Sequence, residues 1–400
     1  MLKVVSVQTA LEIIKDNFSD ISIPTETVSL EESLGRVLAD DIISSENIPA
    51  FDRSTVDGYA LIASDTYGSS ESIPSQLDIV GEILMGQEAT INITSGQCVK
   101  ISTGGMLPEG ADSVVMVENT DNSFGDMCLV YKSVSPNENV NRKGDDIKDG
   151  FPVFTKGRTI TSREIGVLSA LGISTVKVFS KPKVGIISTG DEIVPIDSHL
   201  SFGKIRDINS HILSCLMREN GCEATLYGIV KDEYNEIISA MKKAVSENDI
   251  VLISGGSSAG ARDMTVDIIS SLGEVYLHGI AMKPGKPTIV GKINGKAVFG
   301  LPGHPTAGYF VTLRLVKSLA DMMLCRNDNI RKIKAKMLCN ISSNHGREEI
   351  LCIKLTEDGA KPLYGKSGVI SLLSESDGYI IIDRNCEGLK ADDETEIFLF

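Results

Sequence analysis

Between residues 183 and 325 the sequence alternates short apolar runs with amphipathic segments, and this alternation limits the possible fold more than any other feature. Continuous apolar runs are typical of parallel strands buried on both faces. Strands connected through helices predict a doubly wound, mainly parallel α/β sheet. Asn294-Gly295 is a hairpin signal, so one edge of this sheet is expected to be antiparallel. The predicted strands are 184–188, 224–230, 250–254, 289–293 and 297–299, and the predicted helices are 210–217, 234–245, 264–272 and 307–325.

The flanking segments have a different character. Apolar residues at helical spacing predict a helix over 7–18, and capping-box pairs predict helices that begin at Ser29 and Thr161, the second ending at Gly172. Short runs between turn residues predict strands at 77–83, 91–93, 99–101, 113–117 and 128–131, and, near the C-terminus, at 334–339, 349–355, 379–383 and 396–400. We therefore expect four domains: a discontinuous N-terminal one (1–46 plus 141–178), a β-rich insert (47–140), the α/β sheet (179–326) and a small β domain (327–400).

Composition excludes several classes of protein. The 39 basic and 54 acidic residues give a net charge of −15, which argues against a nucleic-acid or anionic membrane surface. The eight cysteines form no C-x-x-C pair, so neither a zinc site nor a disulfide framework is expected. No apolar run approaches the roughly 18–20 residues of a membrane span, and the N-terminus lacks the features of a signal peptide. A cytoplasmic enzyme is the expectation.

Chemistry-bearing residues follow four successive strands of the predicted sheet. The loops 189–192, 231–232, 255–263 and 301–305 leave the carboxyl ends of neighbouring strands, where α/β folds bind their ligands. The Gly- and Ser-rich segment 254–258 lies before a helix and is suited to an anion. Glu192, Asp232 and Asp263 offer oxygen ligands to Mg²⁺, and Lys283 and Lys286 offer ammonium groups to an oxyanion. Each feature alone also fits a turn, a helix cap or a solvated loop, but their convergence on one edge favours a site.

The motifs that carry these residues resemble the MoeA and gephyrin E-domain family, the molybdopterin molybdenumtransferases, along essentially the whole chain. Two blocks are specific: Asp57-Gly58-Tyr59-Ala60 and Lys283-Pro284-Gly285-Lys286-Pro287. The other matching segments are 49–56, 101–108, 142–147, 188–192, 254–260 and 300–303.

The resemblance implies a molybdopterin-binding fold for the central sheet, a β-barrel-like C-terminal domain, and a homodimer whose active site is shared between subunits. It implies Mg²⁺ as cofactor, adenylylated molybdopterin and molybdate (or tungstate) as substrates, and AMP as a product. The upstream adenylyltransferase and apo-molybdoenzymes are further expected partners. The catalytic residues implied are Asp57, Thr103, Glu192, Asp232 and Asp263. The substrate- or oxyanion-binding residues implied are Ser254, Gly255, Gly256, Ser257, Ser258, Lys283, Lys286, Pro302, Arg347, Ser367 and Ser371.

The sequence departs from the family pattern at three places, one of which, Arg53 where Asn or another residue is common, has no obvious consequence. Where Asn-Pro-Val-Ser is common, this chain has His304-Pro305-Thr306-Ala307, so one hydroxyl contact is lost at Ala307 unless Thr306 replaces it, and His304 is either a structural donor or a ligand contact. Lys366 stands where Gly is usual before Ser367, which adds a positive charge.

Two other functions remain as alternatives. An adenylyltransferase on the same sheet fold would leave residues 1–178 and 327–400 without a role. A non-catalytic scaffold of the gephyrin type would tolerate loss of the acidic and basic site residues, all of which are present here.

Overall fold

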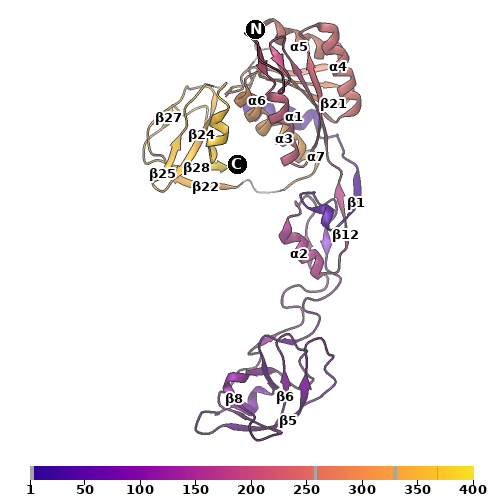
Figure 1. Ribbon diagram of the computed structural model, residues 1–400, viewed down its shortest axis with the longest axis vertical. Coiled ribbons are helices and arrows are strands. Elements are labelled where there is room, and N and C mark those ends of the chain that lie inside the picture. The colour runs from indigo at the N-terminus through magenta and orange to yellow at the C-terminus, as the bar shows by residue number, and fades with distance from the viewer. Residues whose placement is uncertain (1–3, 256–258, 328–330, 367) are drawn as a thin grey trace. The chain divides into compact units, whose positions relative to one another are not determined.

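The computed structural model describes residues 4–255, 259–327, 331–366 and 368–400, with side chains not described for 259–263. The chain divides into two compact units, which are considered separately (Figure 1). Unit 1 comprises Met1–Asp40, Lys156–Thr161 and Thr175–Phe400, and unit 2 comprises Asp41–Thr155 and Ser162–Ser174.

A six-stranded sheet forms the centre of unit 1, in the order β16-β13-β17-β21-β20-β18. The first four strands, β16 (Glu223–Val230), β13 (Lys183–Thr189), β17 (Ile250–Ser254) and β21 (Lys296–Leu301), are parallel. β20 (Ile289–Ile293) pairs antiparallel with β21, and β18 (Glu274–His278) pairs antiparallel with β20 and so runs in the same direction as the first four. Asn294 and Gly295 join β20 to β21 with φ of 48° and 79°, the positive values that a tight hairpin turn requires. The mainly parallel sheet with one antiparallel edge is therefore confirmed.

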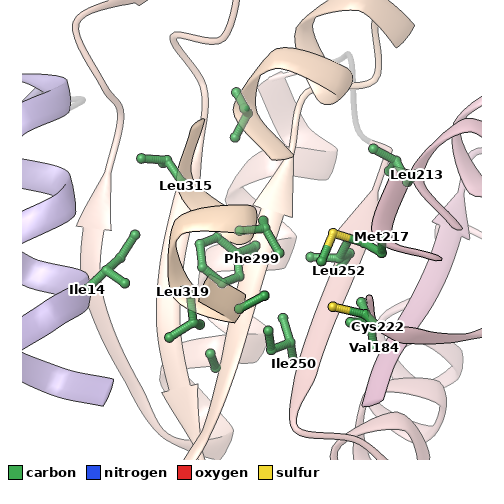
Figure 2. Packing of buried hydrophobic residues seen from close by; sticks show 14 of the residues in the cluster. Ile14, Val184, Leu213, Met217, Cys222, Ile250, Leu252, Phe299, Leu315 and Leu319 are labelled. Atoms are coloured by element: carbon green, nitrogen blue, oxygen red, sulfur yellow. The ribbon is translucent and has the colours of Figure 1, made fainter. Parts of the chain in front are cut away.

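Helices cover both faces of this sheet. Ile250, Leu252 and Phe299 belong to a core shared with α1 (Val7–Phe18), α3 (Asn209–Glu219), α6 (Pro305–Val311) and α7 (Lys317–Met323), part of which Figure 2 shows. Val251 and Ile253 point to the other face, where α4 (Tyr234–Glu247) and α5 (Ala259–Leu272) pack. Successive residues of β17 thus serve opposite cores, which is why its sequence is apolar throughout. Each buried side chain of this size contributes about 1.5–3 kcal/mol.

The predicted helix over 307–325 is not a single α-helix. It begins at Pro305, changes to π-helical turns over Thr312–Val316 and resumes as α7. Its apolar residues fit either helical form, so the pattern could not distinguish them. Within the described ranges, no helix combines the length and apolar composition that crossing a membrane requires.

A second sheet of unit 1 is built from the C-terminal residues, in the order β19-β24-β26-β28-β22, with β25 (Gly359–Pro362) also on β24. Its strands are β24 (Glu348–Thr356), β26 (Gly378–Ile382), β28 (Glu394–Leu399) and β22 (Lys332–Lys336), in agreement with the predicted C-terminal β segments. The edge strand β19 (Met282–Lys283) comes instead from the loop that follows β18, and Lys283 pairs with Glu349 in parallel register. The lysine-bearing loop is therefore attached to the C-terminal sheet.

Unit 2 contains a sheet in the order β7-β4-β6-β5-β9-β8. The strands β5 (Ser75–Ile83), β6 (Gln97–Ile101), β7 (Ser113–Met116) and β9 (Met127–Val130) match predicted ones, and β8 is Thr120–Asp121. The expected strand at 91–93 is wrong: only Asn92 makes an isolated bridge, to Glu109. The helix predicted after Thr161 is confirmed as α2 (Ser162–Ala170), and Gly172 follows it with φ +66°.

The strand β4 (Gly58–Leu61), which lies between β7 and β6 in this sheet, was not predicted. A Cβ on Gly58 would lie 1.8 Å from the carbonyl oxygen of Val115 in β7, so only glycine fits here. Glycine normally weakens a strand, and for that reason the run carried no strand signal.

The helix predicted from Ser29 is also wrong. Ser29 ends β1 (Thr25–Ser29), which pairs with β12 (Thr175–Phe179), and only one 3-10 turn, Glu31–Ser33, follows. The capping box itself forms, because the Ser29 hydroxyl donates to Glu32 and the Glu32 N–H donates back to the Ser29 hydroxyl. Gly35 then takes φ +76°, which is incompatible with a continuing helix.

Candidate functional site

The carboxyl ends of β13, β16, β17 and β21 lie along one edge of the central sheet because these strands are parallel neighbours. Register pairs Thr189 with Val230 and Ser254 with Leu301 at this edge. The four predicted loops therefore leave from adjacent points. This placement follows from topology alone and needs no special side-chain interaction.

Three acidic residues gather where β13 and β16 end. The N–H of Asp232 donates to Asp191 at 3.5 Å, and one carboxylate oxygen of Asp232 is buried with no hydrogen-bond partner among the described residues. Burial, followed by the negative charges of Asp191 and Glu192, raises the pKa of Asp232, against a smaller opposing effect of a hydrogen bond with Thr189. A carboxylate held in this way is suited to a hard cation.

The predicted metal set of Glu192, Asp232 and Asp263 is brought together only in part. Glu192 and Asp232 interact electrostatically, whereas the side chain of Asp263 lies outside the described part. Within the described ranges, no three His, Cys, Asp or Glu side chains converge closely enough to hold a metal ion by themselves. Mg²⁺ commonly needs only one or two carboxylates, with water and substrate phosphate completing its shell.

Asn209 links two of the strand ends. Its side-chain amide donates to the Ser254 hydroxyl at 2.7 Å and to the Gly303 carbonyl at 2.9 Å, while its own carbonyl oxygen is buried without a partner among the described residues. Asp207 accepts from the N–H and the hydroxyl of Ser210 and so secures the start of α3. Asn209 was not predicted from the sequence, because a polar residue at the start of a helix also fits a simple capping role.

Gly255 continues from Ser254 into the predicted anion loop. A Cβ there would lie 2.0 Å from the hydroxyl oxygen and 2.3 Å from the carbonyl oxygen of Thr189, so glycine permits the ends of β17 and β13 to approach closely. Gly256, Ser257 and Ser258, predicted to bind an anion, lie outside the described residues.

A cavity of about 650 Å³ lies beside the lysine-bearing loop in unit 1. Four cationic residues and one acidic residue line it: Lys283, Lys286, Arg347, Lys366 and Glu349. Lys283 pairs with Glu349 at 2.7 Å, and the other three cations make no ion pair within the described part of the chain. The charged lining therefore carries a net charge of +3 (four minus one), in a protein of net charge −15.

The remaining lining of the cavity is mostly apolar. Phe310 from α6, Ile350 from β24 and Leu363 beyond β25 contribute to it. An apolar wall beside several cations is suited to a flat heterocycle that carries an anionic group. Neither Glu349 nor this wall was identified from the sequence, since a Glu within an Arg-Glu-Glu run reads as solvent-exposed.

The segment that departs from the family pattern also borders this cavity. His304 and Ala307 line it, as does the predicted Pro302. The Thr306 hydroxyl donates to the carbonyl of Val369 at 3.3 Å. Ser367 lies outside the described residues, and Ser371 begins α8 (Ser371–Glu375) and lines a separate depression with Tyr309 and Phe400.

Asp57 and Thr103, the two site residues predicted in unit 2, lie together. The Thr103 N–H donates to the Asp57 carboxylate at 2.7 Å, and the Asp57 carbonyl accepts from the Val117 N–H at 3.0 Å. Asp57 also borders a small pocket with the ion pair Glu82–Lys100, whose charged atoms are 2.8 Å apart. The loop before β4 thus holds the carboxylate in a defined position.

Comparison with known proteins covers nearly the whole chain. Residues 5–172 match the family model of the MoeA N-terminal region (domains I and II), residues 185–320 that of a probable molybdopterin-binding domain, and residues 334–400 that of the MoeA C-terminal region (domain IV).

Individual relatives and solved structures agree with these matches. A molybdopterin molybdenumtransferase of Staphylococcus aureus is 32% identical over 386 residues, 94% of this chain and 92% of the relative. A Methanocaldococcus jannaschii protein whose name assigns it to molybdopterin biosynthesis is 38% identical over 380 residues, 93% of this chain and 91% of its own. The crystal structure of a molybdopterin biosynthesis MoeA protein from Pyrococcus horikoshii superposes with a TM-score of 0.89 at 35% identity and covers both chains completely.

Proposed function

We propose that this chain, which belongs to the MoeA family of molybdopterin biosynthesis proteins, is a molybdopterin molybdenumtransferase that inserts molybdate into adenylylated molybdopterin and releases AMP. The cavity lined by Lys283, Lys286, Arg347 and Lys366 is the observation that carries the proposal. A surplus of positive charge beside an apolar wall matches substrates that combine an oxyanion, a phosphate and a pterin ring. Tungstate has the same charge and would enter the same cavity.

The cationic residues bind and orient the anions in this proposal. Arg347 supplies a planar fork of donors, whereas Lys283 and Lys286 act as compact charges that fit a tetrahedral oxyanion from several directions. Holding molybdate beside the pterin in one cavity makes their reaction effectively unimolecular. Asp57 and Thr103 complete the proposed catalytic group, and the active form is proposed to be a homodimer whose two copies both contribute residues to each site.

The strand-end carboxylates are the proposed Mg²⁺ ligands. Glu192 and Asp232 suit this ion because both supply oxygen donors and one oxygen of Asp232 is buried without a partner among the described residues. Asp263 is the proposed third residue. Mg²⁺ would supply charge neutralisation at the phosphoanhydride. Ser254, whose hydroxyl accepts from Asn209, and Gly255, which lies close against Thr189, would place backbone and hydroxyl groups against the nucleotide phosphate.

Incubation of the purified chain with adenylylated molybdopterin, Mg²⁺ and molybdate tests the proposal. We expect AMP release and molybdenum incorporation in equal amounts, both dependent on molybdate. Omission of the oxyanion is the matched control. Synthesis of adenylylated molybdopterin from ATP, without metal insertion, would instead favour an adenylyltransferase. Absence of both reactions would favour a scaffold.

A further inference from the structure

Glu349 is the acidic residue among the charged residues that line the cavity, the other four of which are cations. Its Oε1 lies 2.7 Å from the Lys283 ammonium, and its Oε2 accepts a hydrogen bond of 2.7 Å from the Ser343 hydroxyl. The Glu349 side chain is 6% exposed, whereas that of Lys283 is 50% exposed. The carboxylate is therefore the fixed member of the pair, and the ammonium is the member with room to move toward a ligand.

Glu348, the neighbour of Glu349 in β24, does not line the cavity and pairs instead with Arg314 at 3.1 Å. Glu349 faces Lys283 because β19 and β24 place these two residues in register. The two adjacent glutamates thus differ in the group that each one neutralises.

We propose that Glu349 is an internal counter-ion that competes with the incoming oxyanion for Lys283 and keeps the affinity of the cavity for free dianions low. The proposal rests on the function proposed above, since it takes Lys283 as an oxyanion ligand. An anion that enters the cavity must share or replace an ion pair that already exists. Glu349 is a positioning residue in this scheme, because it acts on the anion through Lys283 and through its own charge.

The charge of the ligand gives the proposal a specific signature. The interaction of an anion with a fixed charge is proportional to the charge of the anion. Removing the Glu349 charge therefore makes the binding free energy of a dianion more favourable by about twice as much as that of a monoanion of the same shape. Molybdate and perrhenate form such a pair, because both are tetrahedral oxyanions with charges of −2 and −1.

The test is calorimetric titration of the full chain with molybdate alone and with perrhenate alone, in the wild type, Glu349→Gln and Glu348→Gln. Glutamine keeps the shape and still accepts from Ser343. For Glu349→Gln we expect the molybdate affinity to rise about tenfold and the perrhenate affinity about threefold, the square root of the first factor. Glu348→Gln, the matched control on the same strand, should change either affinity less than twofold.

Three results would overturn the inference: weaker or unchanged molybdate binding by Glu349→Gln, equal gains for the two anions, or no binding by any of the three proteins. If Glu349 had a purely structural role, Glu349→Gln would weaken the binding of both anions by the same factor. Failure of the proposed function is distinguishable, because wild-type protein that binds molybdate but releases no AMP from adenylylated molybdopterin would contradict the function and not the counter-ion.

Discussion

At the carboxyl end of β16 the charged form of Asp232 is unfavourable, since burial and the neighbouring Asp191 and Glu192 all oppose it. The raised pKa means that the folded chain binds a proton at Asp232 more readily than the unfolded chain does. Stability linked to this group is thus present at low pH and is lost as the pH rises through the raised pKa. A carboxyl group with a raised pKa is typical of functional sites.

We therefore expect Asp232→Asn to increase the free energy of unfolding at pH 7. The gain should disappear as the pH falls below the ordinary carboxyl range, where Asp232 is protonated in both states. Added Mg²⁺ should stabilise the wild type and not the variant. Urea unfolding at several pH values, with and without Mg²⁺, measures both effects, with exposed Asp197→Asn as control. Destabilisation by Asp232→Asn at pH 7 would contradict the expected sign.

Asp57 differs from Asp232 because its carboxylate is exposed and already accepts the Thr103 N–H. For Asp57→Ala we expect a loss of stability of about 1 kcal/mol, from one charged hydrogen bond at the surface. AMP release should fall on the order of 100-fold or more. Glu82→Gln, at the other carboxylate of the same small pocket, is the control. Turnover near the wild-type level in Asp57→Ala would remove Asp57 from the proposed catalytic group.

Residue type indicated the two lysines and the strand-end carboxylates, and the family resemblance added Arg347, Pro302 and Ser371. Lys283, Lys286, Arg347 and Pro302 line one cavity, whereas Ser371 lines another depression. Glu349 was missed because its burial depends on a strand pairing between segments more than 60 residues apart, which no local pattern reports. A role that depends on pairing between distant strands cannot be predicted from a local sequence motif.

At the scale of elements, continuous apolar runs were predicted best, because they have few alternative structures. The limits of the buried strands β17 and β20 were predicted to the residue, and those of the more exposed edge strand β16 to within one residue. The strand β4 was missed because glycine has a low strand propensity. Gly58 is required there because the neighbouring strand leaves no room for a side chain. The strand β19 was missed because two residues are too few for a pattern.

Two glycines provide a matched prediction about elements. Gly255→Ala should destabilise unit 1 by about 1–3 kcal/mol, because the new Cβ meets backbone and hydroxyl atoms of Thr189. Gly166→Ala, inside α2 with no atom within 4 Å of the new Cβ, should stabilise unit 2 by about 0.5–1 kcal/mol. Urea unfolding monitored in each unit measures both changes. Equal effects of the two substitutions would show that the close approach of β17 to β13 is not restrictive.

At the scale of the whole molecule, the proposed sharing of sites between copies predicts complementation. Asp57→Ala and Lys283→Ala should each be inactive as homodimers. If each site takes Asp57 from one copy and Lys283 from the other, half of the randomly mixed dimers are heterodimers with one intact site. Refolding an equal mixture of the two variants together should then restore about one quarter of the wild-type AMP release, the limit set by random pairing. No recovery, with heterodimers verified by mass spectrometry, would place both residues of a site in one copy.

The pairing of β19 with β24 has a consequence for how this chain is dissected. The strand that carries Lys283 precedes the last two strands of the central sheet in the sequence, yet it hydrogen-bonds to a strand that begins 65 residues later. Deleting the C-terminal residues would therefore remove the strand that pairs with β19, although β19 itself is retained. A fragment ending near residue 326 would keep Lys283 and Lys286 but lose the strand pairing that positions Lys283.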